Sequence, residues 1–115
     1  MNLFTLVAKK MRVECPCGEL IKDVGDPSAS FADLLPSQCM DDYCSAIEKA
    51  VHQHSEDPDV ASQWVVHDTV PFFRQMCQCP RCGRVFIEDE NHRTHEFVPA
   101  AANVPRDLLS RRDAR

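Results

Sequence analysis

Two short stretches of the chain each combine a pair of cysteines with a proline and a glycine. Residues 79–83 read Cys-Pro-Arg-Cys-Gly, and residues 15–18 read Cys-Pro-Cys-Gly. Two cysteines this close can bind the same tetrahedral ion if the backbone between them turns tightly. Proline favours such a turn, and glycine relieves crowding after the second cysteine because it tolerates positive φ. The pattern predicts two metal-binding turns.

Pairing the two turns gives four thiolates, the usual donor set of a closed structural zinc site. The predicted ligands are Cys15, Cys17, Cys79 and Cys82. Because a closed site has no open coordination position, it cannot activate a water molecule. We therefore predict a structural zinc ion, no catalytic residues and no enzyme activity. The ion would join two distant parts of a small domain whose core alone is marginal.

The remaining candidate ligands fit a metal site less well. Cys77 alternates with Cys79 along an expected strand, and is either a bystander or a substitute for one of the ligands. Cys44 is expected in the core face of a helix. His92 and His95 are expected to be exposed loop histidines, because no second pair completes a site with them. Four basic residues near the predicted ligands could offset the charge of the thiolates: Arg12, Lys22, Arg81 and Arg84.

Composition places the chain among small folded proteins. It has 115 residues, of which 43% are hydrophobic and 27% charged, which suits one globular domain. The formal net charge of -5 disfavours binding to nucleic acid. Six acids and the single base Lys49 lie between Cys39 and Asp59. This local excess of acids indicates either a solvated helix face or an acidic docking surface.

The seven cysteines could indicate disulfides or metal ligands, and the expected compartment decides between them. The first ten residues contain a six-residue apolar run with the lysines behind it, which is the wrong order for a signal peptide. No apolar stretch approaches the roughly 20 residues that span a bilayer. We therefore expect a cytoplasmic protein without membrane contact, in which clustered cysteines bind metal.

The expected fold is α+β: a small antiparallel sheet of the zinc-ribbon kind, with one or two helices inserted between the cysteine turns. Residues 1–10 are expected to be a leader or an extra strand, and Met11 is an alternative start. We expect a single domain over 11–100, with a helical insert at 37–67. Residues 101–115 are expected to be a flexible tail.

Within the insert, Ser37 is expected to cap a helix that runs to about residue 53. One apolar stripe at helical spacing is expected to face the core: Met40, Tyr43, Cys44, Ile47 and Val51. A second short helix is expected to follow Asp57, with Val60 and Trp64 on its buried side. Strands are expected at 72–76, 84–87 and 96–98.

Residues 79–89 resemble the second half of a zinc ribbon or rubredoxin-type knuckle. Together with the turn at 15–18, the layout over 11–98 resembles small bacterial zinc-ribbon proteins with a helical insert. This resemblance implies a metal site and a fold, and supplies no function. The spacings Cys-x-Cys and Cys-x-x-Cys also resemble the zinc domain of the redox-regulated heat-shock chaperone. That resemblance implies redox switching by zinc release, although 61 residues intervene here, more than in that family.

Three classes of function remain open. The first is a non-catalytic protein–protein interaction domain, adaptor-like or immunity-like, that neutralises a basic partner with its acidic helix. The second is a nucleic-acid-binding zinc ribbon that uses arginines around the cysteine turn and in the tail, which the net charge disfavours. The third is a redox sensor in which oxidation of the four thiolates releases zinc.

Overall fold

The computed structural model describes residues 12–22 and 29–111 of the chain. Two helices and two antiparallel sheets form an α+β fold, as predicted, and the helices are inserted between the two cysteine turns. Residues 1–11, with the expected leader or extra strand and the alternative start, lie outside the described part. The described chain divides into a helical unit, Leu35–Phe73, and a sheet unit made of 12–22, 29–34 and 74–111.

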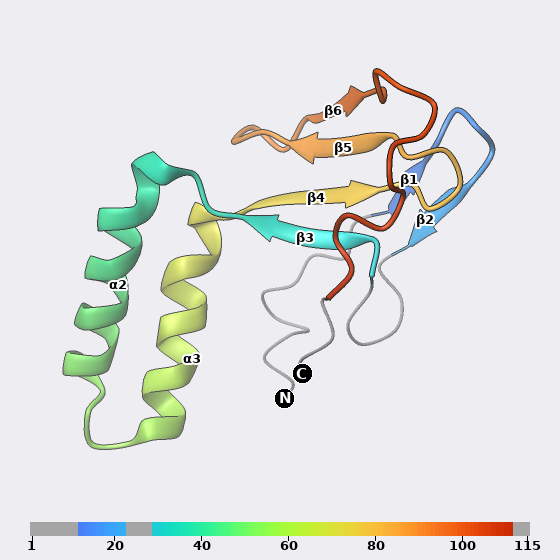
Figure 1. Cartoon of the computed structure of the whole chain (residues 1–115). Helices are drawn as coiled ribbons and strands as arrows, with labels where there is room; N and C mark the ends of the chain where they lie inside the picture. The colour runs from blue at the N-terminus through green and yellow to red at the C-terminus, as the bar shows by residue number, and fades with distance from the viewer. Residues whose placement is uncertain (1–11, 23–28, 112–115) are drawn as a thin grey trace. The chain divides into compact units, whose positions relative to one another are not determined.

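The helical unit is a hairpin of two antiparallel helices that lie side by side (Figure 1). Its elements are η1 (Ser37–Cys39), α2 (Met40–Gln53), α3 (Pro58–Thr69) and η2 (Val70–Phe72). Asp57 caps α3, as predicted, because its carboxylate accepts hydrogen bonds from the backbone N–H groups of Asp59 at 3.0 Å and Val60 at 3.4 Å. In the described part of the chain, no helix is long and apolar enough to cross a membrane.

The start of the first helix differs from the prediction. The chain enters α2 through the 3-10 turn η1, and the side chain of Ser37 makes no capping hydrogen bond. The 3-10 turn supplies a backbone alternative, because the N–H of Cys39 donates to the carbonyl of Pro36 at 2.9 Å. A tightened first turn of this kind satisfies terminal backbone groups without a side-chain cap.

The buried face of the hairpin is also rotated from the expected stripe. Tyr43 and Ile47 are half-buried, but Cys44 is exposed and Met40 and Val51 are nearly half exposed, at 46% and 48%. The most buried helical residue is Ala50, at 1%. On α3 the buried residues are Ala61 and Thr69, whereas Trp64 is 42% exposed and was wrongly expected inside. Small residues at the contact allow close helix approach, which favours the alanine face over the larger apolar residues.

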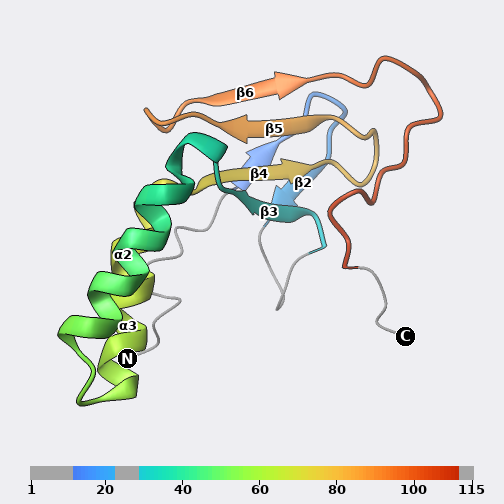
Figure 2. The same cartoon turned by 60° about the vertical axis from the view of Figure 1, so that its left-hand side comes forward.

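The sheet unit contains a two-stranded and a four-stranded antiparallel sheet (Figure 2). In the small sheet β1 (Arg12–Glu14) pairs with β2 (Leu20–Lys22). The larger sheet has the order β3 (Phe31–Leu34), β4 (Arg74–Gln78), β5 (Val85–Glu88) and β6 (Thr94–Phe97). The last three correspond to the strands predicted after the helices, with bounds shifted by one or two residues. The strands place the two cysteine turns at β1–β2 and at β4–β5.

The two sheets share one small core. Its buried members are Cys15, Ile21, Cys77, Cys79 and Phe86. Three of the five are cysteines, so few large apolar side chains are buried in this part of the chain. Cys77 is fully buried because its neighbours in register on β3 and β5 are Phe31 and Phe86.

The segment after β6 returns to β4 and is held there by one buried side chain. Gln78 is 1% exposed, and its side-chain amide donates to the carbonyl of Pro105 at 2.9 Å. Its side-chain oxygen accepts a hydrogen bond from the N–H of Leu108 at 2.8 Å. These contacts fall within the segment expected to be a flexible tail. They fix 105–108 at two points, and the flexibility of the segment stays a prediction.

Candidate metal centre

The first cysteine turn connects β1 to β2. The N–H of Gly18 donates to the carbonyl of Cys15 at 2.9 Å, and the N–H of Cys15 donates to the carbonyl of Glu19 at 2.9 Å. Gly18 has φ of 100°, a conformation that L side chains rarely adopt. The glycine after the cysteine pair therefore has the role predicted from the sequence.

The second cysteine turn connects β4 to β5 and repeats this arrangement. The N–H of Gly83 donates to the carbonyl of Cys79 at 2.9 Å, and the N–H of Cys79 donates to the carbonyl of Arg84 at 2.8 Å. Gly83 has φ of 85°. A Cβ at this position would lie 3.4 Å from Cγ of Pro99 and 3.6 Å from Cγ of Arg106, so glycine also permits the close return of the chain.

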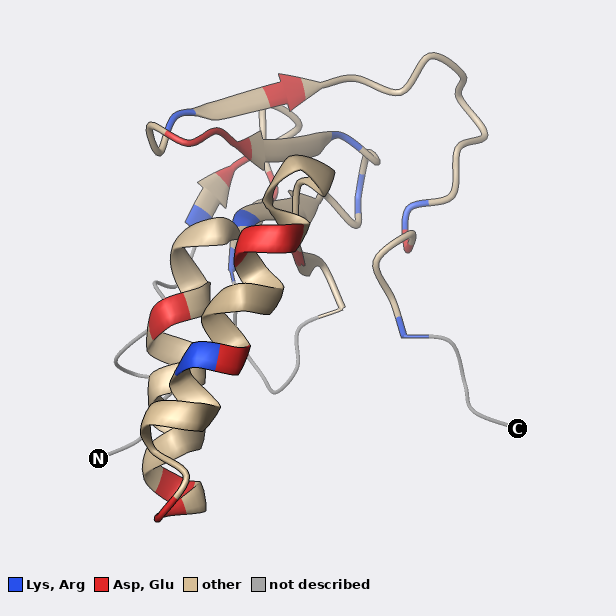
Figure 3. Ribbon diagram, turned by 90° about the vertical axis from the view of Figure 1, so that its left-hand side faces the viewer, with Lys and Arg blue, Asp and Glu red and all other residues tan. Residues whose placement is uncertain are grey.

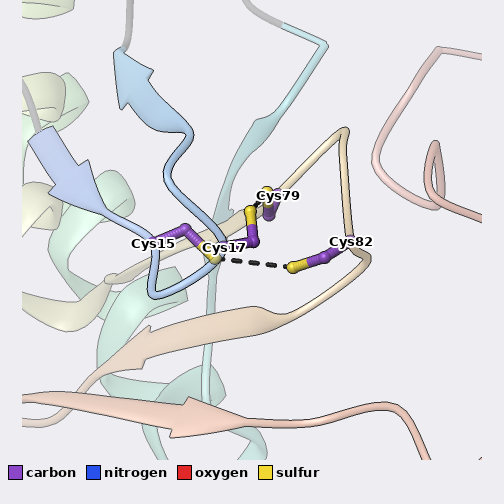
Figure 4. A group of neighbouring side chains, drawn as sticks. All are labelled: Cys15, Cys17, Cys79 and Cys82. Carbon is purple, nitrogen blue, oxygen red and sulfur yellow. Dashed lines mark hydrogen bonds between the residues drawn. The ribbon is translucent and has the colours of Figure 1, made fainter.

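The four predicted ligand residues lie together, one pair from each turn, and their side chains point toward one another (Figure 4). All four sulfur atoms lie within 4.8 Å of one another. Across the turns, Cys15 Sγ is 3.4 Å from Cys82 Sγ, and Cys17 Sγ is 3.6 Å from Cys79 Sγ. The cluster has the donor set and the size to hold a metal ion.

The electrostatics of the metal-free cluster divide the thiols into two kinds. Burial raises the pKa of the Cys82 thiol, but hydrogen bonds from the backbone N–H and the guanidinium of Arg84 outweigh this and lower the pKa to about 6. Nη1 of Arg84 donates to Cys82 Sγ at 3.3 Å. By contrast, burial raises the pKa of Cys15 to about 12 and also raises that of Cys79. These shifts favour the thiolate form of Cys82 and the protonated forms of Cys15 and Cys79 in the metal-free cluster.

Among the described residues, Arg84 is the one predicted basic neighbour whose side chain donates a hydrogen bond to sulfur. Its Nε also lies 3.5 Å from Oε2 of Glu96, although the geometry of this ion pair leaves Nε without a hydrogen bond. Nη1 of Arg81 lies 3.7 Å from the position that a Cβ on Gly18 would take, above the first turn. The two guanidinium groups thus differ, because that of Arg84 contacts sulfur and that of Arg81 lies beside the first turn.

The other cysteines are not members of this cluster. Cys77 is fully buried in the core beside Cys79, and burial, followed by the electrostatic interaction with Cys79, raises its pKa to about 11. Cys39 is half-buried and Cys44 exposed in the helical unit. Sequence reasoning placed Cys44 in a core face, which is wrong because α2 packs through Tyr43 and Ala50.

His92 and His95 are both exposed, as expected, but only His92 lies in the turn between β5 and β6, whereas His95 lies in strand β6. His92 Nδ1 lies 3.3 Å from Oε1 of Glu88, and His95 Nε2 lies 2.8 Å from Oδ2 of Asp89. Among the residues that the structure describes, the four cysteines are the one group of three or more potential ligands close enough to hold an ion. The two histidines instead have carboxylate partners in the hairpin.

Sequence reasoning missed the role of Gln78, which lies between two cysteines. Period-two alternation along a strand points Gln78 away from the face of Cys77 and Cys79. That signal was present in the sequence. The distant backbone partners of Gln78, at Pro105 and Leu108, had no sequence signal because they depend on the return of the chain after β6.

No curated protein and no solved structure matches the chain. No zinc-ribbon family is identified by these comparisons, so the resemblance to zinc ribbons rests on the two cysteine turns. Residues 11–101 match a protein family, and they make up most of the chain. The chain belongs to the family described as "Domain of unknown function (DUF8617)".

Proposed function

We propose that the chain is a non-catalytic zinc-binding protein in which Cys15, Cys17, Cys79 and Cys82 hold a structural zinc ion. The main support for this proposal is that the four sulfur atoms all lie within 4.8 Å of one another. Thiolates around tetrahedral zinc lie about 2.3 Å from the ion and hence about 3.8 Å from each other. The cross-turn separations of 3.4 and 3.6 Å are close to that value.

The proposed ion would act as a staple between the two sheets. The turn at 15–18 and the turn at 79–83 contact each other through a core that buries five residues, three of them cysteines. A core this small supplies little stability by apolar burial. Zinc bound by both turns would increase the free energy of unfolding of this unit and would hold the two turns together.

The same donor set also suits iron, because tetrahedral sulfur sites bind zinc or iron. Elemental analysis of the purified full chain separates these ions, and we expect about one zinc per chain. Cys79→Ser should lose the metal, whereas Cys44→Ser, which changes an exposed cysteine outside the cluster, should retain it. A coloured protein with stoichiometric iron would contradict the zinc assignment.

We further propose that the helical unit binds a basic partner protein. Leu35–Phe73 contains seven acids, Asp41, Asp42, Glu48, Glu56, Asp57, Asp59 and Asp68, against the one base Lys49, a net charge of -6. Figure 3 shows acidic bands on both helices of the hairpin. Large apolar side chains are exposed on the same unit, with Met40 at 46%, Val51 at 48% and Trp64 at 42%.

This combination of acidic charge and exposed apolar side chains supports a docking surface that prefers basic partner proteins. Complementary charge mainly increases the association rate and excludes acidic partners, and exposed apolar side chains supply contact area. The partner is expected to present lysines or arginines around an apolar centre. Binding of that kind weakens as salt rises because the charges are exposed.

The test uses charge reversal and a partner isolated from the native host. Asp41→Lys with Asp42→Lys should lower the affinity for that partner at low salt by tenfold or more. The matched control, Glu88→Lys with Glu90→Lys, reverses two acids in the sheet unit and should leave the affinity unchanged. An affinity that is insensitive to the helical charges, or a captured partner with an acidic surface, would contradict the proposal.

The cross-turn thiol pairs favour a redox switch as the second candidate. Cys15 lies close to Cys82 and Cys17 close to Cys79. After zinc release, hydrogen peroxide could oxidise each pair of thiols to a disulfide, with the peroxide reduced to two waters. Mass spectrometry after peroxide treatment should then find disulfides between the turns. Zinc retained with four free thiols would dismiss the switch and leave the structural site intact.

A further inference from the structure

The sheet unit has an open groove beside the cysteine cluster, with a volume of about 550 Å³. One side is formed by the second cysteine turn, and the other by the segment that follows β6. Three arginines line it: Arg81, Arg84 and Arg106. The rest of the lining is apolar or sulfur-bearing, including Val98, Val104 and Cys17.

The charge of the groove is unlike that of the chain as a whole. The chain has a net charge of -5, whereas the lining holds three guanidinium groups, no carboxylate and the two cluster cysteines Cys17 and Cys82. Arg84 has Cys82 and Glu96 as partners. For the guanidinium groups of Arg81 and Arg106, the described residues include neither an ion-pair partner nor a hydrogen-bond acceptor, so both groups are available to a ligand.

The wall that carries Arg106 is held in place on both sides of that residue. Pro105 and Leu108 hydrogen bond to the buried Gln78, at 2.9 and 2.8 Å. The stem of Arg106 lies over Gly83, with its Cγ 3.6 Å from the position of a Cβ there. Because the backbone around Arg106 is fixed, less conformational entropy is lost when a ligand binds.

We propose that this groove binds a small organic phosphate ester, with Arg81 and Arg106 contacting the phosphate oxygens. The planar guanidinium fork matches phosphate geometry, and a phosphate dianion has enough oxygens and charge for two arginines. The apolar wall of Val98, Val104 and the intervening alanines contacts the organic part. This inference goes beyond the proposed function, since it requires neither a partner protein nor a redox step.

The lining favours a small ester over single-stranded nucleic acid. Proteins that bind single strands stack successive bases on aromatic side chains. Among the residues that line the groove none is aromatic. A free ester needs only the phosphate contact and an apolar surface of small side chains, and this groove supplies both.

Isothermal titration of the metal-loaded full chain tests the proposal, with butyl phosphate as the probe. We expect saturable binding of butyl phosphate, and weaker binding of inorganic phosphate, which lacks the apolar part. Arg81→Gln and Arg106→Gln should each raise the Kd about tenfold or more, because each removes a charge-assisted hydrogen bond. Arg93→Gln is the matched control: it removes the same charge at the exposed turn between β5 and β6 and should leave the Kd unchanged.

The assignment is overturned if butyl phosphate does not saturate the chain, or if Arg93→Gln weakens binding as much as the groove variants. If butyrate binds as tightly as butyl phosphate, the groove would be assigned to carboxylate ligands instead of phosphate esters. Tight binding of a single-stranded oligonucleotide without binding of butyl phosphate would assign the groove to a polymer. Thermal melting checks the fold of each variant, and if Arg106→Gln unfolds, the exposed Arg81 decides the outcome.

Discussion

The backbone N–H of Leu108 donates a hydrogen bond of 2.8 Å to the side-chain oxygen of Gln78, thirty residues earlier in the chain. With the bond from the same amide to Pro105, it ties the segment after β6 to the interior of the sheet unit. A buried amide of this kind is costly to leave without partners. Gln78 therefore links the position of the cysteine turn to that of the C-terminal segment.

Replacing Gln78 by methionine keeps the side chain's length and apolar volume but removes its hydrogen bonds to Leu108, to Pro105 and, at 3.5 Å, to Gly83. We expect the free energy of unfolding to fall by about 1–3 kcal/mol, since three backbone groups lose their side-chain partner. Urea unfolding measures the change, and hydrogen exchange at the Leu108 amide should accelerate. The control is Gln63→Met on α3, where the side chain is exposed. Unchanged exchange at Leu108 would show that the contact does not hold the segment.

A second prediction concerns removal of the proposed zinc ion. Chelation, or Cys82→Ser, should abolish cooperative unfolding of the sheet unit, because the remaining core buries few apolar side chains. The helical hairpin has its own packing and should keep its far-ultraviolet circular dichroism. Near-ultraviolet dichroism and thermal melting of the full chain measure the loss, and Cys44→Ser serves as the control. A chelated protein with an unchanged melting temperature would contradict the staple.

The four clustered cysteines could be predicted because their turns are local. Proline and glycine beside each cysteine pair shape a short loop, and the structure gives both glycines positive φ. The α+β class, the helix at 40–53 and the Asp57 cap were also predictable, since they depend on periodicity and neighbouring residues. The cross-turn partners of each thiol are a tertiary property that spacing alone does not give.

The packing of the helical hairpin could not be predicted in the same way. Hydrophobicity favoured Met40, Cys44 and Val51 as the core stripe, but the contact uses Ala50 and α3 residues such as Ala61. Helices approach closely where the side chains at their contact are small. Which face of α2 forms that contact depends on α3 and cannot be derived from the sequence of α2 alone. The position of Arg106 beside the second cysteine turn likewise could not be derived from spacing, because it depends on the segment after β6 bringing Arg106 to Gly83.

The contacts of Asp89 at the turn between β5 and β6 predict how the stability of this hairpin changes as the pH falls. A hydrogen bond with His95, together with the backbone N–H groups of Arg93 and Asn91, lowers the pKa of Asp89 from 3.8 to about 2. A carboxylate whose pKa is lower in the folded state stabilises the fold at pH values above its pKa in the unfolded state. This contribution is lost as the pH falls to the pKa in the folded state. The hairpin should therefore weaken between about pH 3.8 and pH 2.

Carboxyl carbon shifts of Asp89, followed by NMR during acid titration, measure this pKa directly. His95→Ala should move the Asp89 midpoint upward, because it removes the largest cause of the shift. His92→Ala is the matched control, since His92 contacts Glu88 instead. Equal effects of the two variants would mean that the His95 contact at 2.8 Å does not set the pKa.

Trp64 is the only tryptophan of the chain and reports on the end of the helical hairpin. The ring of His54 stacks on it with a centroid distance of 5.2 Å and an interplanar angle of 5°. We expect His54→Ala to expose more of the indole, which should increase quenching of its fluorescence by acrylamide and shift the emission to longer wavelength. His52→Ala, at an exposed position on α2, should change neither. If both variants behave alike, the stacked contact with His54 does not shield Trp64.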